Sequence, residues 1–275
     1  MTAPKTTPKT YAFPLTDPIN LVAQLGHGSL TVDARDDVTE ATVTLSAREP
    51  DVLERFTVEL RGSALTVRGP RQRGVTDLLG SWRKSRDAVE VSIVVPAGTA
   101  ARLETATAPI TVTGRIGPAD VSTAHATIDL ATVTGDLRLQ YGNGESRVGA
   151  VTGSVQLKAG KADAHFGRIL GSITYGVGSG SLAASEVRGD LHARSGSGST
   201  SVDAAYGNVD LATGSGSLTV GVPDGVSVHL DVVTGSGMLH SELPVEQAPK
   251  AGSKPVTLRA RTGRGDVRLV RAPAA

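Results

Sequence analysis

The sequence predicts an all-β fold: a single-stranded parallel β-helix, or β-solenoid, with 18-residue coils, preceded by an antiparallel β cap. Between regularly spaced glycines, apolar and polar residues alternate with the period of two that is typical of a half-buried strand. A second glycine series with the same interval runs from Gly142 to Gly214. The first series recurs every 18 residues, at Gly117, Gly135, Gly153, Gly171, Gly189, Gly207 and Gly225.

Each repeat is expected to hold two strands separated by a turn. After Gly135 the chain alternates, breaks at the Gly-Asn-Gly of residues 142–144, and alternates again as far as Val151. Because like residues recur at the same place in every repeat, we expect coils to stack about 4.8 Å apart, with glycine at the corners. Apolar columns would then fill a narrow interior, and one such column holds Leu137, Val155, Ile173, Leu191 and Val209.

From Tyr11 to Gly69 the chain alternates like β-strands but lacks the 18-residue period. Residues 1–10 are rich in Pro, Thr and Lys and are predicted to form a flexible tail. Residues 11–100 are predicted to form the antiparallel cap, which seals an end of the solenoid against edge-to-edge aggregation, with hairpin turns at 26–28 and 61–63. The expected strands are Asn20–Leu25, Ser29–Ala34, Glu40–Ala47, Arg55–Leu60, Ala64–Arg68 and Val89–Pro96.

A mobile loop is predicted within the cap, over residues 70–88. Long loops that carry an aromatic residue and clustered arginines are candidate contact sites. The competing interpretation is an ordinary surface loop whose tryptophan folds back on the cap. The candidate interaction residues are Arg71, Arg73, Trp82, Arg83, Lys84 and Arg86.

Residues 101–275 are predicted to form the parallel solenoid. The repeat begins within Leu103–Thr113 and continues to Gly225. From Val226 the register is expected to slip by one residue, followed by a corner at 234–237. Residues 256–270 would supply the last coil.

Composition limits the classes of function. The 275 residues have a formal net charge of +1, so no nucleic-acid partner is expected. The chain has no cysteine, which excludes disulfides and thiolate metal sites. The sequence has neither a signal-peptide pattern nor an apolar run long enough to span a bilayer. We therefore expect a cytoplasmic protein, with the cell surface as the alternative if it is exported by a non-standard route.

The sequence indicates no catalytic, cofactor or metal site. No two of the six histidines share a column of the 18-residue repeat. His192 has Asp210 as its neighbour one coil on, and we interpret the two as an exposed ladder pair. The corners resemble calcium-binding β-rolls, but at 181, 199 and 217 serine stands where a carboxylate is needed. These observations favour a protein that is not an enzyme and needs no cofactor.

Several segments resemble a family of bacterial β-strand repeat proteins of unknown function, the DUF4097 family, which carries an adhesin label. The resemblance covers most of the chain and implies the same β-repeat fold and a surface location. It is carried by residues 94–98 (Val-Val-Pro-Ala-Gly), the recurring Thr-x-x-Gly-Asp/Ser corners, residues 222–226 with Leu230-Asp231, and residues 259–267.

Together these features predict a non-enzymatic scaffold or binding module for an unknown protein or polysaccharide partner. Its repetitive strand faces would carry the contact, and the loop from Arg71 to Arg86 would add specificity. One alternative is a structural protein that self-associates by polymerising through its solenoid ends. A less favoured alternative is a carbohydrate-active enzyme on a β-helix, which would need converging carboxylates on one face.

Overall fold

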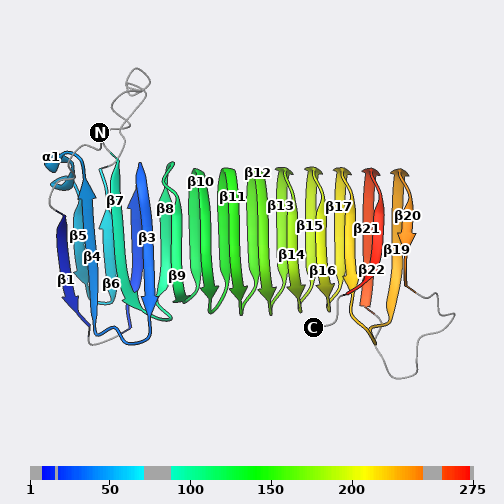
Figure 1. The fold of residues 1–275 in the computed structure, drawn as a ribbon, viewed down its shortest axis with the longest axis horizontal. Coiled ribbons are helices and arrows are strands. Elements are labelled where there is room, and N and C mark those ends of the chain that lie inside the picture. The colour runs from blue at the N-terminus through cyan, green and yellow to red at the C-terminus, as the bar shows by residue number, and fades with distance from the viewer. Residues whose placement is uncertain (1–7, 16–17, 71–87, 244–255, 273–275) are drawn as a thin grey trace, which may run out of the picture. The chain divides into compact units, whose positions relative to one another are not determined.

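The computed structural model describes residues 8–15, 18–70, 88–243 and 256–272. Within these ranges the chain forms 22 strands and one short helix, α1 (Pro50–Leu53), and most strands pair in parallel. The predicted all-β solenoid is confirmed (Figure 1). The chain divides into two compact units. Unit 1 comprises residues 1–135 and 140–144, and unit 2 comprises residues 136–139 and 145–275.

Strands of unit 2 stack with the predicted interval of 18 residues. Ile173 is the parallel partner of Val155 on one side and of Leu191 on the other, and all three side chains are buried. In Figure 1 these strands lie side by side from green to yellow. Their bounds are β12 (Val155–Ile169), β13 (Ile173–Ser179), β14 (Leu182–Val187), β15 (Leu191–Ser197), β16 (Thr200–Ala205), β17 (Val209–Ser215) and β18 (Leu218–Val222).

Glycine is required at the corners because successive coils touch there. Gly198 has φ of +131°, and a Cβ atom placed on it would lie 1.8 Å from the carbonyl oxygen of Gly180. No side chain fits that space, and few L residues adopt that backbone conformation. Four glycines with positive φ lie two positions after members of the glycine series that begins at Gly142: Gly144, Gly180, Gly198 and Gly216.

The interior also contains hydroxyl pairs. The Ser195 hydroxyl donates to Thr213 Oγ1 over 3.0 Å in unit 2. In unit 1, Thr105 and Thr123 are buried and their hydroxyls lie 3.0 Å apart. Pairing polar groups in this way avoids the cost of burying an unsatisfied hydroxyl.

Parallel coils begin in unit 1 earlier than the sequence suggested. β2 (Asn20–Leu25) pairs in parallel with β6 (Ala64–Arg68) and β8 (Ala100–Thr105). β3 (Gly28–Arg35) pairs in parallel with β7 (Val89–Pro96) and β9 (Ile110–Ile116). The predicted hairpin at 26–28 is therefore wrong. Gly28, with φ of +125°, instead makes a solenoid corner between two strands of the same coil.

Antiparallel strands cover the coil made by β6 and β7. β4 (Glu40–Ala47) pairs antiparallel with β7 and with β1 (Lys9–Pro14). β5 (Thr57–Arg61) and β6 form the predicted hairpin around Gly62, so that prediction is confirmed. The sequence did not indicate α1, which has a proline in its first turn and buries Val52 and Leu53. The remaining long strands are β10 (Ala119–Val133) and β11 (Leu137–Val151).

The last segment of the chain is inserted between two earlier coils. β21 (Val256–Arg264) pairs in parallel with both β17 and β19 (Val228–Ser236). β22 (Val267–Arg271) pairs likewise with β18 and β20 (Leu239–Ser241). Residues 256–270 form a coil as predicted, but their predicted position as the last coil is wrong. Their apolar residues continue the columns of β17 and β18, and Leu258, Ala260, Val267 and Leu269 are buried.

The insertion also corrects the predicted register slip. Val209 is the partner of Leu258, and Leu258 is the partner of Leu230. Leu230 therefore takes the place that an 18-residue step assigns to residue 227, so the register shifts by three residues rather than one. The additional residues lie in the connection from β18 to β19, which includes Gly225 with φ of +81°.

Candidate functional site

Exposed cations gather on one sheet of unit 2, made of β12, β13, β15, β17, β21 and β19. Strand alternation sends every second side chain outward, so an outward residue on one strand lies beside an outward residue on the next. Two carboxylates, Asp210 and Asp231, lie among these cations. We name this surface the basic strip, and its cations are Lys158, Lys161, Arg194, Arg259, Arg261 and Arg264.

One column of the basic strip carries a cation on every second strand. Gly176 pairs with Lys158 on one side and with Arg194 on the other. Ala212 pairs with Arg194 and with Arg261. Since neighbouring strands lie about 4.8 Å apart, the cations of this column recur about every 10 Å along the sheet. The residues between them are small and leave the positive groups accessible.

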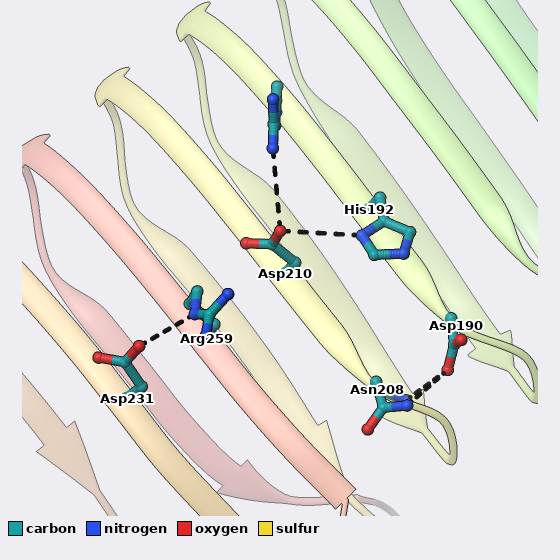
Figure 2. A network of polar contacts seen from close by, with 7 residues as sticks. Asp190, His192, Asn208, Asp210, Asp231 and Arg259 are labelled. Carbon is teal, nitrogen blue, oxygen red and sulfur yellow. Dashed lines mark hydrogen bonds and ion pairs between the residues drawn. The ribbon is translucent and has the colours of Figure 1, made fainter.

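The two carboxylates pair with cations on adjacent strands (Figure 2). Asp210 Oδ2 lies 3.8 Å from His192 Nδ1 and 4.0 Å from an Arg194 nitrogen. The predicted contact of His192 with Asp210 is thus confirmed, and the His192 side chain is 53% exposed. Exposed ion pairs of this kind contribute about 0–1 kcal/mol to stability, so a ligand can replace them at low cost.

The second carboxylate is held more closely. Arg259 Nε donates to Asp231 Oδ2 over 2.9 Å, and Arg261 lies 3.7 Å from the same oxygen. Figure 2 shows Arg259 reaching from its strand to Asp231 on the neighbouring one. The Arg194 and Arg261 side chains remain 79% and 57% exposed, and Lys158 makes no ion pair within the described part of the chain. The cation column can therefore accept a further anion.

A shallow groove of about 660 Å³ runs beside this column and is open to solvent. Its lining includes Arg194 and Arg261, the valines Val177 and Val233, and the exposed glycines Gly196, Gly214 and Gly263. Because glycine has no side chain, a ligand can approach the backbone closely at these three glycines. The residues that line the groove come from five strands, β13, β15, β17, β21 and β19, and Lys158 extends the cation column to β12.

The turns that border this sheet carry a separate polar ladder, shown in part in Figure 2. The backbone N–H and the side-chain amide of Asn208 donate to Asp190 Oδ1 over 2.9 and 3.1 Å. In the next winding, Thr257 N–H donates to Asn208 Oδ1 over 3.0 Å. These side chains satisfy corner N–H groups, so the Asp/Ser of the repeated corner motif is structural, a role that was not predicted from the sequence.

The opposite sheet of unit 2 carries charges of both signs in compensated clusters. Glu186 accepts hydrogen bonds from Arg188 (2.7 Å) and Arg168 (3.0 Å). The Arg188 hydrogen bond, helped by that of Arg168, holds the pKa of Glu186 below its ordinary value of 4.5. This face therefore lacks the run of available cations that marks the basic strip.

The predicted interaction residues Arg71, Arg73, Trp82, Arg83, Lys84 and Arg86 lie outside the described residues. In the described ranges, no group of three or more His, Asp or Glu side chains is arranged to hold a metal ion. No helix in those ranges is long and apolar enough to cross a membrane. Sequence reasoning missed the basic strip because Arg259, Arg261 and Arg264 join it only through the inserted β21.

No family model matches the chain, and neither does any curated protein. Similar solved structures include a "putative adhesin" from Parabacteroides distasonis, 14% identical with a TM-score of 0.42. A second "putative adhesin", from Bacteroides fragilis, is 11% identical with a TM-score of 0.44. Each alignment covers 96% of this chain and 97% of the other.

A "putative lipid binding protein" from P. distasonis is 11% identical, with a TM-score of 0.32 and the same coverage. At these identities and TM-scores, the names of the similar proteins do not transfer a ligand to this chain.

Proposed function

We propose that the chain is a non-enzymatic, adhesin-like binding module that holds an acidic polysaccharide along the basic strip of unit 2. The observation that carries this proposal is the cation column Lys158, Arg194 and Arg261, with a positive group on every second strand. A polymer that alternates a uronic acid with a neutral sugar presents its carboxylates at a comparable interval when extended. The sheet offers its cations at fixed positions, which lowers the entropic cost of binding.

The chemistry of the strip suits carboxylates. A guanidinium group presents paired donors that match a carboxylate, and Arg194 and Arg261 are both well exposed. Gly196, Gly214 and Gly263 in the lining of the groove let sugar rings lie close to the sheet. Existing contacts of the arginines with Asp210 and Asp231 are long, at 3.7 to 4.0 Å, so that a ligand carboxylate can compete for them.

Nucleic acid fits the strip less well. Proteins that bind single strands without sequence preference combine cations with aromatic side chains on which bases stack. The paired outward columns of the strip contain no phenylalanine, tyrosine or tryptophan, and the His192 ring in them is paired with Asp210. An acidic polysaccharide needs no stacking platform, and this favours it over nucleic acid as the ligand.

An enzymatic role fits less well than binding. Glycoside hydrolysis uses two carboxylates about 5–9.5 Å apart on either side of the scissile bond. The carboxylates of the basic strip are Asp210 and Asp231. Arg259 lies on the strand between them and is the register partner of both. Two strand spacings place them about 10 Å apart.

An acidic polysaccharide ligand favours the cell surface over the cytoplasm, the two locations expected from the sequence. Fractionation of the native host with an antibody to the chain tests the location independently of binding. Recovery in the surface fraction supports the proposal, and recovery only in the cytoplasmic fraction opposes it.

Calorimetric titration with hyaluronan oligosaccharides, which carry one carboxylate in every second sugar, tests the function. We expect saturable binding that weakens as salt rises. The triple variant K158Q/R194Q/R261Q should bind at least tenfold more weakly. The matched control R147Q/R168Q/R268Q removes the same charge from the opposite sheet and should bind like the wild type.

Dextran, which is neutral, and single-stranded DNA of equal charge serve as competitor ligands. Equal losses in the two triple variants, or tighter binding of the DNA than of hyaluronan, would contradict the proposal. If both triple variants lost hyaluronan binding, the binding would reflect general charge attraction and not a localised site.

A further inference from the structure

Exposed apolar side chains gather on the coil made by β19 and β20. Six large hydrophobic residues are exposed in the described part of the chain, and four of them belong to this coil or its turn. Their exposed fractions are 37% for Leu230, 54% for Val233, 69% for Met238 and 49% for Leu239. Such a cluster on a solvent-exposed face commonly marks an interaction site.

The same coil also presents free strand edges. β19 pairs with β21 and β20 pairs with β22, and no other described strand pairs with either of them. Each of the two strands therefore has one edge whose backbone N–H and C=O groups lack a strand partner among the described residues. Exposed edges of this kind favour pairing with another chain.

The interior columns of unit 2 end at this coil. Leu230 and Val232 are the partners of Leu258 and Ala260, which are 1% and 0% exposed. One step farther on, Leu230 is 37% exposed because no described strand covers it. The coil thus offers an apolar centre between two unpaired strand edges.

In unit 1, by contrast, the coil made by β6 and β7 is covered by other strands. β6 and β7 are covered by the antiparallel strands β5 and β4, and Leu65 and Ile93 are fully buried. The outer strand β1 begins at Lys9 and ends at Pro14, and β5 carries the ion pair of Glu59 with Arg61. Lysine, proline and charged pairs are the usual protection of an edge strand. A filament would need a second open apolar coil, which the described part of unit 1 does not provide.

We propose that the β19–β20 coil is the interface of a two-fold dimer, in which the same coil of a second copy of this chain covers it. A two-fold interface requires only one self-complementary patch per chain and closes after two copies. Rotation by 180° about an axis perpendicular to the stacking direction brings edge strands together antiparallel, a pairing that sheets readily accept. This assembly differs from the end-to-end polymer considered as an alternative from the sequence.

A covering strand from the chain itself is the competing occupant. Residues 244–255, outside the described residues, connect β20 to β21. Their sequence, Pro-Val-Glu-Gln-Ala-Pro-Lys-Ala-Gly-Ser-Lys-Pro, has three prolines and one large apolar residue, Val245. Proline cannot donate to a strand ladder, which makes this sequence a poor source of a covering strand. A second copy supplies both the ladder and the apolar surface.

Sedimentation velocity over a range of protein concentrations tests the assembly. We expect a concentration-dependent species of twice the chain mass of 28.1 kDa, with no larger species. The variant L230K/L239K should remain monomeric, while its circular dichroism and unfolding midpoint show that the rest of the fold is kept. A wild-type monomer at all concentrations, or a series of growing oligomers, would overturn the proposal.

Cysteine crosslinking gives a second readout that does not depend on a destabilising change. The chain has no cysteine, so each introduced thiol is unique. H229C, V233C and S241C place one thiol at a time on the proposed interface, and we expect at least one of them to give a covalent dimer on mild oxidation. T174C, exposed on β13, is the matched control and should stay monomeric.

Replacing residues 244–255 by a Gly/Ser linker of equal length separates the two occupants. We expect the linker variant to dimerise like the wild type. If the wild type is monomeric and the linker variant dimerises, then residues 244–255 cover the coil and the proposal is wrong. This result would leave polysaccharide binding by the basic strip unaffected.

Discussion

Arg194 and Arg261 both pair with Ala212, one from each neighbouring strand, although they belong to coils that do not follow each other in the sequence. The insertion of β21 between β17 and β19 creates this arrangement. It extends the alternation of cation and small residue that begins at Lys158 and Gly176. The charge pattern of the basic strip thus depends on the topology of the last coils.

Ala212→Asp tests the space between the two arginines. The new carboxylate would lie one strand from each guanidinium group and compete with a ligand carboxylate for them. We expect binding of hyaluronan oligosaccharides to weaken about tenfold, or ~1.4 kcal/mol, with little change in the unfolding midpoint. Ala183→Asp, on β14 of the opposite sheet, is the control and should leave titration unchanged. Equal weakening by both substitutions would contradict a localised site.

Gly198→Ala tests the close contact between coils. A Cβ atom there would lie 1.8 Å from the Gly180 carbonyl oxygen, at a φ of +131°. Because backbone must move to relieve this contact, we expect a loss of about 2 kcal/mol or more in the free energy of unfolding, measured with urea. Gly176→Ala is the matched control, since a Cβ atom placed on Gly176 would meet nothing within 4 Å among the described residues. Similar stability of the two variants would be evidence against direct stacking.

Glu186 predicts a pH dependence of stability. Its pKa is lowered in the folded protein, chiefly by the hydrogen bond from Arg188. A group of this kind adds stability that is present above its unfolded pKa and is lost as pH falls through its folded pKa. We expect wild type and Glu186→Gln to differ most above about pH 4.5 and to converge in stability at lower pH. A difference that grows on acidification would contradict this assignment.

Asp190→Ala tests the corner ladder. Asp190 Oδ1 accepts hydrogen bonds from the backbone and the side chain of Asn208. Losing this acceptor should cost about 1 kcal/mol of unfolding free energy, with hydrogen exchange at the Asn208 amide accelerated. Asp203→Ala, an exposed residue of β16, should change neither quantity. If hydrogen exchange at the Asn208 amide were unchanged in Asp190→Ala, the structural role assigned to the corner Asp/Ser would be wrong.

Strand pairs separated by the regular 18-residue interval could be predicted from the sequence. Strand pairs between segments at irregular separations could not. The column of Val155, Ile173 and Leu191 could be predicted because each residue meets the one 18 places on. The pairing of β2 with β8 and of β17 with β21 could not, since the partners are 80 and 49 residues apart in the register and follow no fixed interval. Alternation in β2 and β3 fits a hairpin and a coil equally well, so only the pairing distinguishes them.

The same distinction between regular and irregular strand pairing decides which parts of the candidate site could be predicted. The contact between His192 and Asp210 followed directly from the 18-residue period. The basic strip did not, because Arg261 lies outside the regular repeat and reaches the column through an insertion. The open edge of β19 could not be predicted either, because residues 256–270 were expected to form the last coil.

Footprinting of arginines by phenylglyoxal and mass spectrometry, with and without hyaluronan oligosaccharide, tests most directly whether the basic strip is the binding site. We predict that ligand protects Arg194 and Arg261, whereas Arg147 and Arg168 on the opposite sheet react at the same rate in both samples. Protection confined to Arg147 and Arg168, or no protection at a saturating ligand concentration, would contradict binding by the basic strip.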